Sequence, residues 1–175
     1  GNLGRAHEYD TIVDAAEQLR DESGIVFLFI GGGALMGPLK AEVEKRGLAN
    51  FMFKPYQPRE QLAESLSVSD VHLISLRPEL EGFIVPSKFY GISGVGRTSI
   101  FIGDVHGEIA MILKREKCGF SVMVGDFNMV VDNIKKLLKS SEVVRNCAHS
   151  TKVLSKQELG KESPIHQYMI LLGNL

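Results

Sequence analysis

The chain alternates between short apolar runs and longer segments in which apolar residues recur every three or four positions. The runs are typical of strands buried on both faces, and the recurrent segments are typical of amphipathic helices. Strands are predicted over 25–33, 50–56, 70–78, 97–104 and 119–126. Helices are predicted over 10–22, 38–47, 58–69, 86–93, 106–116, 126–139 and parts of 141–159. This order predicts an α/β fold, a Rossmann-like three-layer α/β/α domain with a mainly parallel sheet.

The ends of the first two predicted helices carry ordinary boundary residues. Asp10 is placed to cap the first helix. Pro38 stands in the first turn of the second helix and Gly47 follows its end.

Composition indicates one ordinary globular domain, which we expect to span residues 1–175. Apolar residues make up 44%, and 20 basic residues nearly balance 21 acidic ones. A net charge of −1 gives no broad basic surface for nucleic acid. No apolar run reaches the roughly 18 residues of a membrane helix. The tail over 160–175 is predicted to be a short apolar helix, and the abrupt start at GNLGR suggests a piece of something longer.

In parallel α/β folds, ligands bind outside the carboxyl ends of the strands. The first loop there holds Gly4 and Arg5 just before a helix. A permissive backbone, free N–H groups and a guanidinium suit a phosphate, although a solvated turn with a surface arginine explains the same residues equally well. In the next loop, GGGALMG fails the dinucleotide fingerprint because Met36 stands where glycine or alanine is required. Tyr56 could flank a planar base, or it could cover a turn set by the neighbouring prolines.

The segment ELEGFIVPSKFYGISGVGR carries the densest chemistry. Glu81 follows an apolar strand, Gly82 can bring backbone amides close to a ligand, and Ser87 and Lys88 begin a helix. A cation in a first turn is unfavourable for the helix itself and so favours an anion-binding role. Ordinary surface charges on a loop remain the alternative.

Metal and nucleophile motifs are not recognisable. His7 and His106 fall in the ligand-side loops, but no histidine pair has metal-ligand spacing. Cys118 and Cys147 are read as two reduced thiols. Glu108 could reach the same crevice or serve as a favourable first-turn acid.

Taken in order, several segments resemble the C-terminal, nucleotide-sugar-binding half of a GT-B glycosyltransferase of family 4. These segments are GNLGRAHEYDTIVDAAEQL, FLFIGGG, FMFKPYQPREQLAESLSVSDVHLISLRPELEGF, VPSKFYGISGVGRTSIFIGD and GEIA. The resemblance covers about residues 1–140. It is especially close to the subgroup that includes bacterial O-antigen and capsule transferases of the amino-deoxyhexose type, with their PSK-[LF]-Y segment.

The resemblance implies a retaining transferase of cell-surface polysaccharide biosynthesis that uses a UDP-sugar or another nucleotide-diphosphate sugar, without metal or other cofactor. Glu81, Lys88 and Arg5 would form the catalytic set. The nucleotide-sugar-binding residues would be Gly4, Arg5, Tyr56, Gln57, Glu81, Gly82, Phe83, Ser87, Lys88 and Glu108. Glu81 would match the first acid of the family's E-x7-E motif, and Ser87 and Lys88 would hold the diphosphate.

The sequence departs from the family pattern at several positions. Phe89 stands where the second acid is expected, so Glu108 becomes the substitute for ribose contact. Asn2 and His7 replace the family's common Arg and Lys in the first loop. Thr98 replaces a common proline, and we assign it no role.

The resemblance also implies partners outside this chain: an N-terminal acceptor-binding domain, a lipid-linked or saccharide acceptor, and a strand just before Gly1 within the sheet. We therefore expect this chain to bind a nucleotide sugar weakly and to transfer nothing alone, with a dimer through the apolar tail as an option. The resemblance fits a cytoplasmic protein whose complete form is peripheral at the inner face of the membrane. Two alternatives stay open, namely a UDP-sugar 2-epimerase-type domain and a degenerate, non-catalytic interaction module.

Overall fold

The structure, a computed structural model, describes residues 1–84 and 87–158. The predicted tail over 160–175 and the predicted helix start at Pro86 lie outside the described residues. Within them, no helix is both long enough and apolar enough to cross a lipid bilayer.

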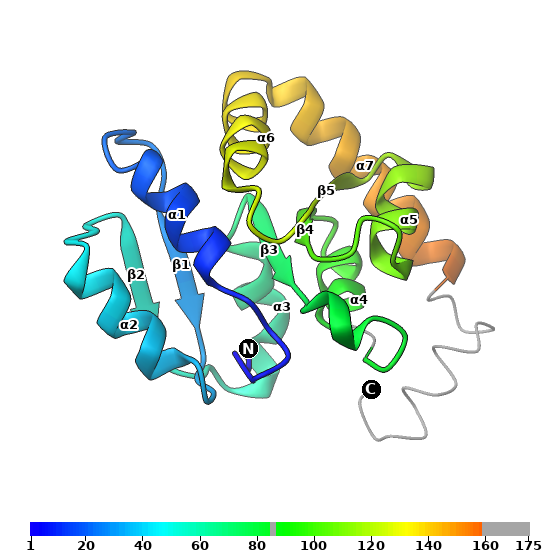
Figure 1. Cartoon of the computed structure of the whole chain (residues 1–175). Helices are drawn as coiled ribbons and strands as arrows, with labels where there is room; N and C mark the ends of the chain where they lie inside the picture. The colour runs from blue at the N-terminus through cyan, green and yellow to red at the C-terminus, as the bar shows by residue number, and fades with distance from the viewer. Residues whose placement is uncertain (85–86, 159–175) are drawn as a thin grey trace.

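The predicted alternation of strands and helices is confirmed (Figure 1). The strands are β1 Phe27–Ile30, β2 Phe51–Lys54, β3 Val71–Ser75, β4 Thr98–Ile102 and β5 Gly119–Val122. The helices are α1 Asp10–Gln18, α2 Met36–Lys45, α3 Leu62–Ser67, α4 Lys88–Gly94, α5 Glu108–Glu116, α6 Phe127–Lys139 and α7 Ser141–Glu158. Two 3-10 turns, η1 Arg59–Gln61 and η2 Pro78–Leu80, precede α3 and follow β3. All strand pairs are parallel, as predicted.

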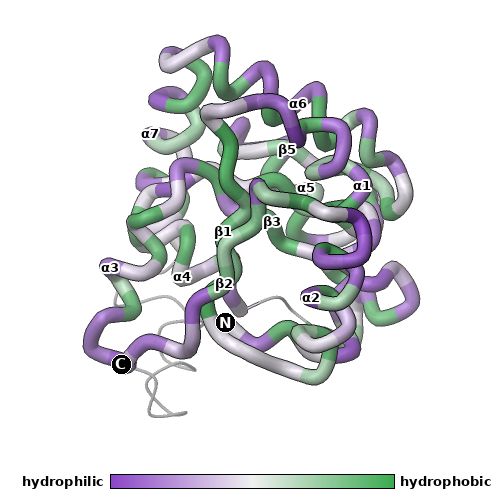
Figure 2. The backbone as a smooth tube through the Cα atoms, turned by 90° about the vertical axis from the view of Figure 1, so that its left-hand side faces the viewer, coloured by the Kyte–Doolittle hydropathy of each residue, from purple (hydrophilic) through white to green (hydrophobic). Residues whose placement is uncertain are grey.

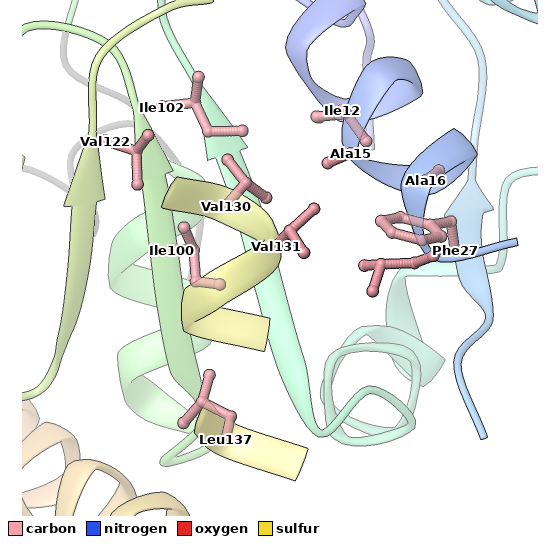
Figure 3. Packing of buried hydrophobic residues seen from close by; sticks show 11 residues of the cluster. Ile12, Ala15, Ala16, Phe27, Ile100, Ile102, Val122, Val130, Val131 and Leu137 are labelled. Atoms are coloured by element: carbon pink, nitrogen blue, oxygen red, sulfur yellow. The ribbon is translucent and has the colours of Figure 1, made fainter. Parts of the chain in front are cut away.

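Alternation of side chains along β4 produces the three layers. Ile100 and Ile102 pack into a core cluster with α1 and α6 (Figure 3). Phe101, between them, packs into a second cluster with α4, α5 and α7. Successive residues of a strand point to opposite faces, so β4 is covered by helices on both sides. Helix α6 buries Val130, Val131 and Leu137 in the first cluster, and hydrophobic and hydrophilic residues alternate along its length (Figure 2).

The described strands form two sheets rather than one. The first sheet pairs β1 with β2, and the second has the order β3-β4-β5. Figure 1 places β1 between β2 and β3, yet no ladder joins β1 to β3 among the described residues. All five residues of β4 are buried, whereas the last three of β1 and the first three of β3 are only half-buried. The half-buried residues belong to the two strands that border this division.

The N-terminal segment pairs with the residues that follow β1. Asn2 bridges Gly32 in parallel, and the Leu3 amide donates to the Gly32 carbonyl at 2.7 Å. Gly31 has φ of 128°, and a Cβ on it would lie 2.0 Å from the carbonyl oxygen of Gly1. The glycines after β1 therefore let the first residues of the chain approach closely.

The start of α1 differs from the prediction. Tyr9, not Asp10, is the N-cap residue, and it makes no side-chain cap hydrogen bond. Instead, Oε1 of the buried Glu8 accepts a hydrogen bond from the Thr11 amide at 2.7 Å. Asp10 lies in the first helical turn, where an acidic residue is favourable through the helix dipole.

Candidate functional site

The loops at the carboxyl edge of the strands form one connected surface. The Arg77 amide, just after β3, donates to the Ala6 carbonyl at 2.9 Å, and Arg77 Nε donates to the His7 carbonyl at 3.2 Å. Lys88, at the start of α4, reaches back to the Asn2 carbonyl at 2.7 Å. The structure thus brings together loop 1–9, the segment after β3 and the start of α4, as the sequence predicted for this edge.

Lys88 is a half-buried cation at this surface. Its Nζ donates to the Asn2 carbonyl and lies 3.2 Å from Nε2 of His7. Among the described residues, no carboxylate lies within 4.0 Å of this ammonium. Burial lowers the pKa of Lys88 from its ordinary value. Its charge is therefore uncompensated, an arrangement that favours an incoming anion.

His7 lies beside Lys88, and its hydrogen bonds allow a single tautomer of the neutral ring. Its Nδ1 lies 2.7 Å from the Ser75 carbonyl, and a carbonyl can only accept, so Nδ1 carries the proton. In the neutral ring Nε2 then accepts a hydrogen bond from Lys88. Burial is the largest cause that lowers the pKa of His7, with a further contribution from Lys88.

Glu81 contacts the start of α5. Its Oε1 accepts a hydrogen bond from the Glu108 amide at 2.8 Å, and its Oε2 is buried without a partner in the described residues. Gly107 permits this contact, because a Cβ there would lie 2.4 Å from the Glu81 carboxyl carbon. A carboxylate at a helix N-terminus is stabilising. Glu81 therefore has a structural function in this fold, a function that sequence reasoning missed.

The position expected to hold the second acid belongs to the core. Phe89 is 1% exposed and packs with Ile92 and Ile109 between α4 and α5. Its ring also lies edge-on to Tyr90, with centroids 5.7 Å apart. Glu108, the proposed substitute, has an exposed side chain beside Glu81. Phe89 is thus a packing residue, and its aromatic character has a physical reason.

Two of the residues that the sequence predicts as diphosphate contacts are open to solvent. Arg5 is exposed in a turn that closes when the His7 amide donates to the Gly4 carbonyl at 3.0 Å. Ser87 is exposed and makes no side-chain cap hydrogen bond to α4. Both side chains remain accessible at the surface that contains Lys88.

The predicted base-binding residues lie beside the turn after β1. Tyr56 is 59% exposed, and its ring is 3.0 Å from where a Cβ on Gly32 would stand. Gln57 is exposed and donates from Nε2 to the Pro55 carbonyl at 3.0 Å. Since Gly32 also pairs with Asn2, the Tyr56 ring adjoins the same N-terminal segment that contacts Lys88.

The loop after η2 leaves an aromatic side chain in solvent. Phe83 is 85% exposed, and Gly82 next to it is exposed as well. Phe83 belongs to none of the three core clusters of the described residues, so Phe83 and Gly82 remain candidates for ligand contact.

An acidic cavity of about 290 Å³ lies nearby, on the α1 side of this edge. Its lining includes Glu8, Asp10, Asp14 and Glu79, with Arg77 as the basic residue. This excess of carboxylates repels a diphosphate, so we assign the anion site to Lys88 and not to the cavity. Among the described residues, no group of three or more His, Cys, Asp or Glu could hold a metal ion.

Comparisons with known proteins identify the family. The profile described as Glycosyl transferases group 1 matches residues 1–153. A protein of Escherichia coli K12 named as a colanic acid biosynthesis glycosyl transferase, WcaI, is 27% identical over 174 residues, which cover 97% of this chain and 40% of WcaI. The chain therefore spans less than half the length of this relative.

Two solved structures share the fold. TarM of S. aureus, in a complex that contains UDP, superposes with a TM-score of 0.78 at 14% identity, covering 98% of this chain and 34% of TarM. The C-terminal domain of LpcC, a glycosyl transferase group 1 family protein of Francisella tularensis, gives 0.72 at 16% identity, covering 90% and 84%. The second match is to an isolated C-terminal domain. The chain belongs to the glycosyl transferases group 1 family and has the Rossmann-like fold of GT-B glycosyltransferase domains.

Proposed function

We propose that this chain is the donor-binding part of a retaining glycosyltransferase of cell-surface polysaccharide biosynthesis and that it binds a UDP-sugar. The observation that carries the proposal is the uncompensated ammonium of Lys88 at the carboxyl edge of a parallel sheet. Membership of the family supports it, and so do the name of WcaI and the UDP bound in the TarM structure.

In this proposal the cations stabilise the leaving nucleoside diphosphate. Cleavage of the sugar–phosphate bond leaves negative charge on the diphosphate, and fixed positive groups stabilise that charge as it develops. Lys88 would contact the diphosphate directly, with the exposed Arg5 as a second cation. Tyr56 and Gln57 would border the base, on the far side of the turn after β1.

In the proposal Glu81 has a structural role in addition to the contact with the donor sugar that the sequence predicted. Its Oε1 receives the Glu108 amide, and its Oε2 has no partner. The residue holds the start of α5 with one oxygen, and its second, buried oxygen would accept a hydrogen bond from a sugar hydroxyl only after the donor displaces the groups that cover it. Glu108 stays beside it as an exposed acid.

Transfer needs an acceptor held next to the donor, because reaction depends on the orientation of both reactants. We assign acceptor binding to parts of the complete protein outside this chain, and we place its reaction in the cytoplasm. The chain alone should bind the donor nucleotide and transfer no sugar.

The test is a nucleotide panel against the intact chain. Thermal shift and ligand-observed NMR should detect binding of UDP, with weaker binding of GDP, ADP and CMP. Binding of a ligand to the folded state raises the melting temperature, and the rise grows with the logarithm of the ligand concentration relative to its Kd. No response to any of the four nucleotides at millimolar concentration would sink the proposal.

A further inference from the structure

We propose that His7 is a positioning residue for Lys88, fixing the direction in which the ammonium faces the donor diphosphate. This inference rests on the function proposed above, since it assigns a helper to the cation that would bind the donor. The observation is a chain of two hydrogen bonds that runs from the Ser75 carbonyl through the His7 ring to the Lys88 ammonium. The bond to Ser75 sets the tautomer of His7, and that tautomer gives Lys88 an acceptor.

The first step is the count of donors on Lys88. An ammonium has three N–H groups at tetrahedral angles and no acceptor. One N–H is held by the Asn2 carbonyl at 2.7 Å and a second by His7 Nε2 at 3.2 Å. With two N–H directions held by groups in loop 1–9, the direction of the third is fixed. Lysine is otherwise a flexible point charge, so this arrangement confers the directionality that an arginine would have through its planar group.

The second step is the protonation state of His7. The Ser75 carbonyl belongs to the last residue of β3 and is therefore part of a rigid element. It requires a proton on Nδ1, which leaves Nε2 as the acceptor. A second proton on Nε2 would remove the acceptor for Lys88 and would make the ring compete with Lys88 for the Asn2 carbonyl, which is also a hydrogen-bond partner of His7. The other charged groups at His7 are the guanidinium of Arg77, on the His7 carbonyl, and the Gly1 amine close to Lys88. The carboxylate of Glu8 is directed toward Thr11 instead.

The third step compares two substitutions of His7, by phenylalanine and by glutamine, and the hydrogen bonds that each one removes. Phenylalanine keeps an aromatic ring but has neither donor nor acceptor. Glutamine presents an amide N–H and an oxygen on one carbon, as the imidazole presents Nδ1 and Nε2, and it does not titrate. His7→Gln should therefore keep both hydrogen bonds, whereas His7→Phe releases Lys88. His106, in the loop after β4, is exposed and serves as the matched control in His106→Phe.

The experiment measures UDP and inorganic pyrophosphate binding by titration calorimetry or NMR for the unaltered chain and the three variants. We expect His7→Phe to weaken UDP binding about tenfold, the size of a lost charge-assisted hydrogen bond. Pyrophosphate, which has no base, should lose the same factor. His7→Gln should stay within about twofold of the unaltered chain, and His106→Phe should change nothing.

A second measurement needs no variant and no ligand. Long-range proton–nitrogen NMR of His7 at neutral pH should report an unprotonated Nε2 and a protonated Nδ1. The opposite tautomer, or a doubly protonated ring, would overturn the inference. So would unchanged UDP and pyrophosphate affinity in a folded His7→Phe variant. By contrast, an unaltered chain that binds neither probe overturns the proposed function itself, a result that no His7 variant can produce.

Discussion

Two half-buried cations of this molecule have opposite surroundings. Arg46, which follows α2, contacts three carboxylates: Asp14 at 2.6 Å, Glu17 at 2.9 Å and Glu42 at 2.7 Å. These hydrogen bonds raise the pKa of Arg46, with Asp14 as the largest cause. Lys88 has a carbonyl and an imidazole as partners, and burial lowers its pKa.

The difference separates a structural cation from a cation suited to a ligand. Arg46 joins α1 to α2, so its charge is neutralised inside the fold. The positive charge of Lys88 costs stability wherever no anion is present, because burial disfavours the charged form. Functional groups are commonly held at some cost to stability. Loss of the charge should therefore lower the stability of the fold at Arg46 and should not lower it at Lys88.

The largest effect is expected for Lys88→Met, which keeps an unbranched side chain without the charge. UDP binding should weaken by about 10- to 100-fold, as expected for a lost charged hydrogen bond to phosphate. The melting temperature of the protein without nucleotide should stay the same or rise. Titration of UDP with the exposed Lys114→Met as control checks this, and equal affinity in both variants would refute the assignment of Lys88.

Removal of the structural cation should have the reverse outcome. Arg46→Met should lower the free energy of unfolding by about 1–2 kcal/mol, since it leaves a network of carboxylates without its centre. UDP affinity at a temperature where the protein stays folded should not change. Denaturant unfolding and UDP titration of the same sample give both quantities, and a loss of affinity here would break the comparison.

Glu81 lies between these extremes, because it contacts both the fold and the proposed site. Glu81→Ala should reduce stability by about 1 kcal/mol through loss of the contact at the start of α5. Glu81→Gln keeps an oxygen that can accept from the Glu108 amide, so it should recover most of that stability. Thermal unfolding of the pair measures this, and identical stability of both variants and the unaltered chain would argue against the structural role.

The smallest effect concerns pH. Burial lowers the pKa of His7 and of His72 in the folded state relative to the ordinary value of 6.5. The unfolded chain then binds more protons, so stability is present above pH 6.5 and falls as pH decreases toward the folded-state pKa values. The loss of stability should be smaller than that caused by the Arg46 and Glu81 variants, because each histidine keeps its hydrogen bond to a backbone carbonyl. Unfolding in urea at several pH values checks it, and His7→Gln should flatten part of the slope.

The sequence predicted the fold well where local pattern decides it. Apolar runs and helical periodicity located all five described strands, because burial on both faces of a parallel sheet demands continuous apolar residues. The sequence-based prediction failed where a contact between distant segments determines the local structure. Glu8 replaced Asp10 as the group that binds a free amide at the start of α1, and this choice depends on how the N-terminal segment is held at the end of β3, where the Glu8 amide donates to the Ser75 hydroxyl.

The candidate site shows the same limit. Lys88 and Glu81 could be selected from residue type and position, but their neighbours could not. The contact between Glu81 and the Glu108 amide spans 27 residues, and the contact between Lys88 and His7 spans 81. Phe89 was a departure from a motif at the level of sequence, and only the packing between α4 and α5 explains it.

The central claim is that a nucleoside diphosphate binds at the surface formed by loop 1–9, Tyr56 and the start of α4. Amide NMR of the nitrogen-labelled chain during a UDP titration tests it most directly. We predict chemical-shift changes at Asn2 to His7, at Tyr56 and Gln57, and at Lys88, with those near Lys88 lost in Lys88→Met. Saturable changes confined to the acidic cavity around Asp14 and Gly125, or to any other face, would contradict the account.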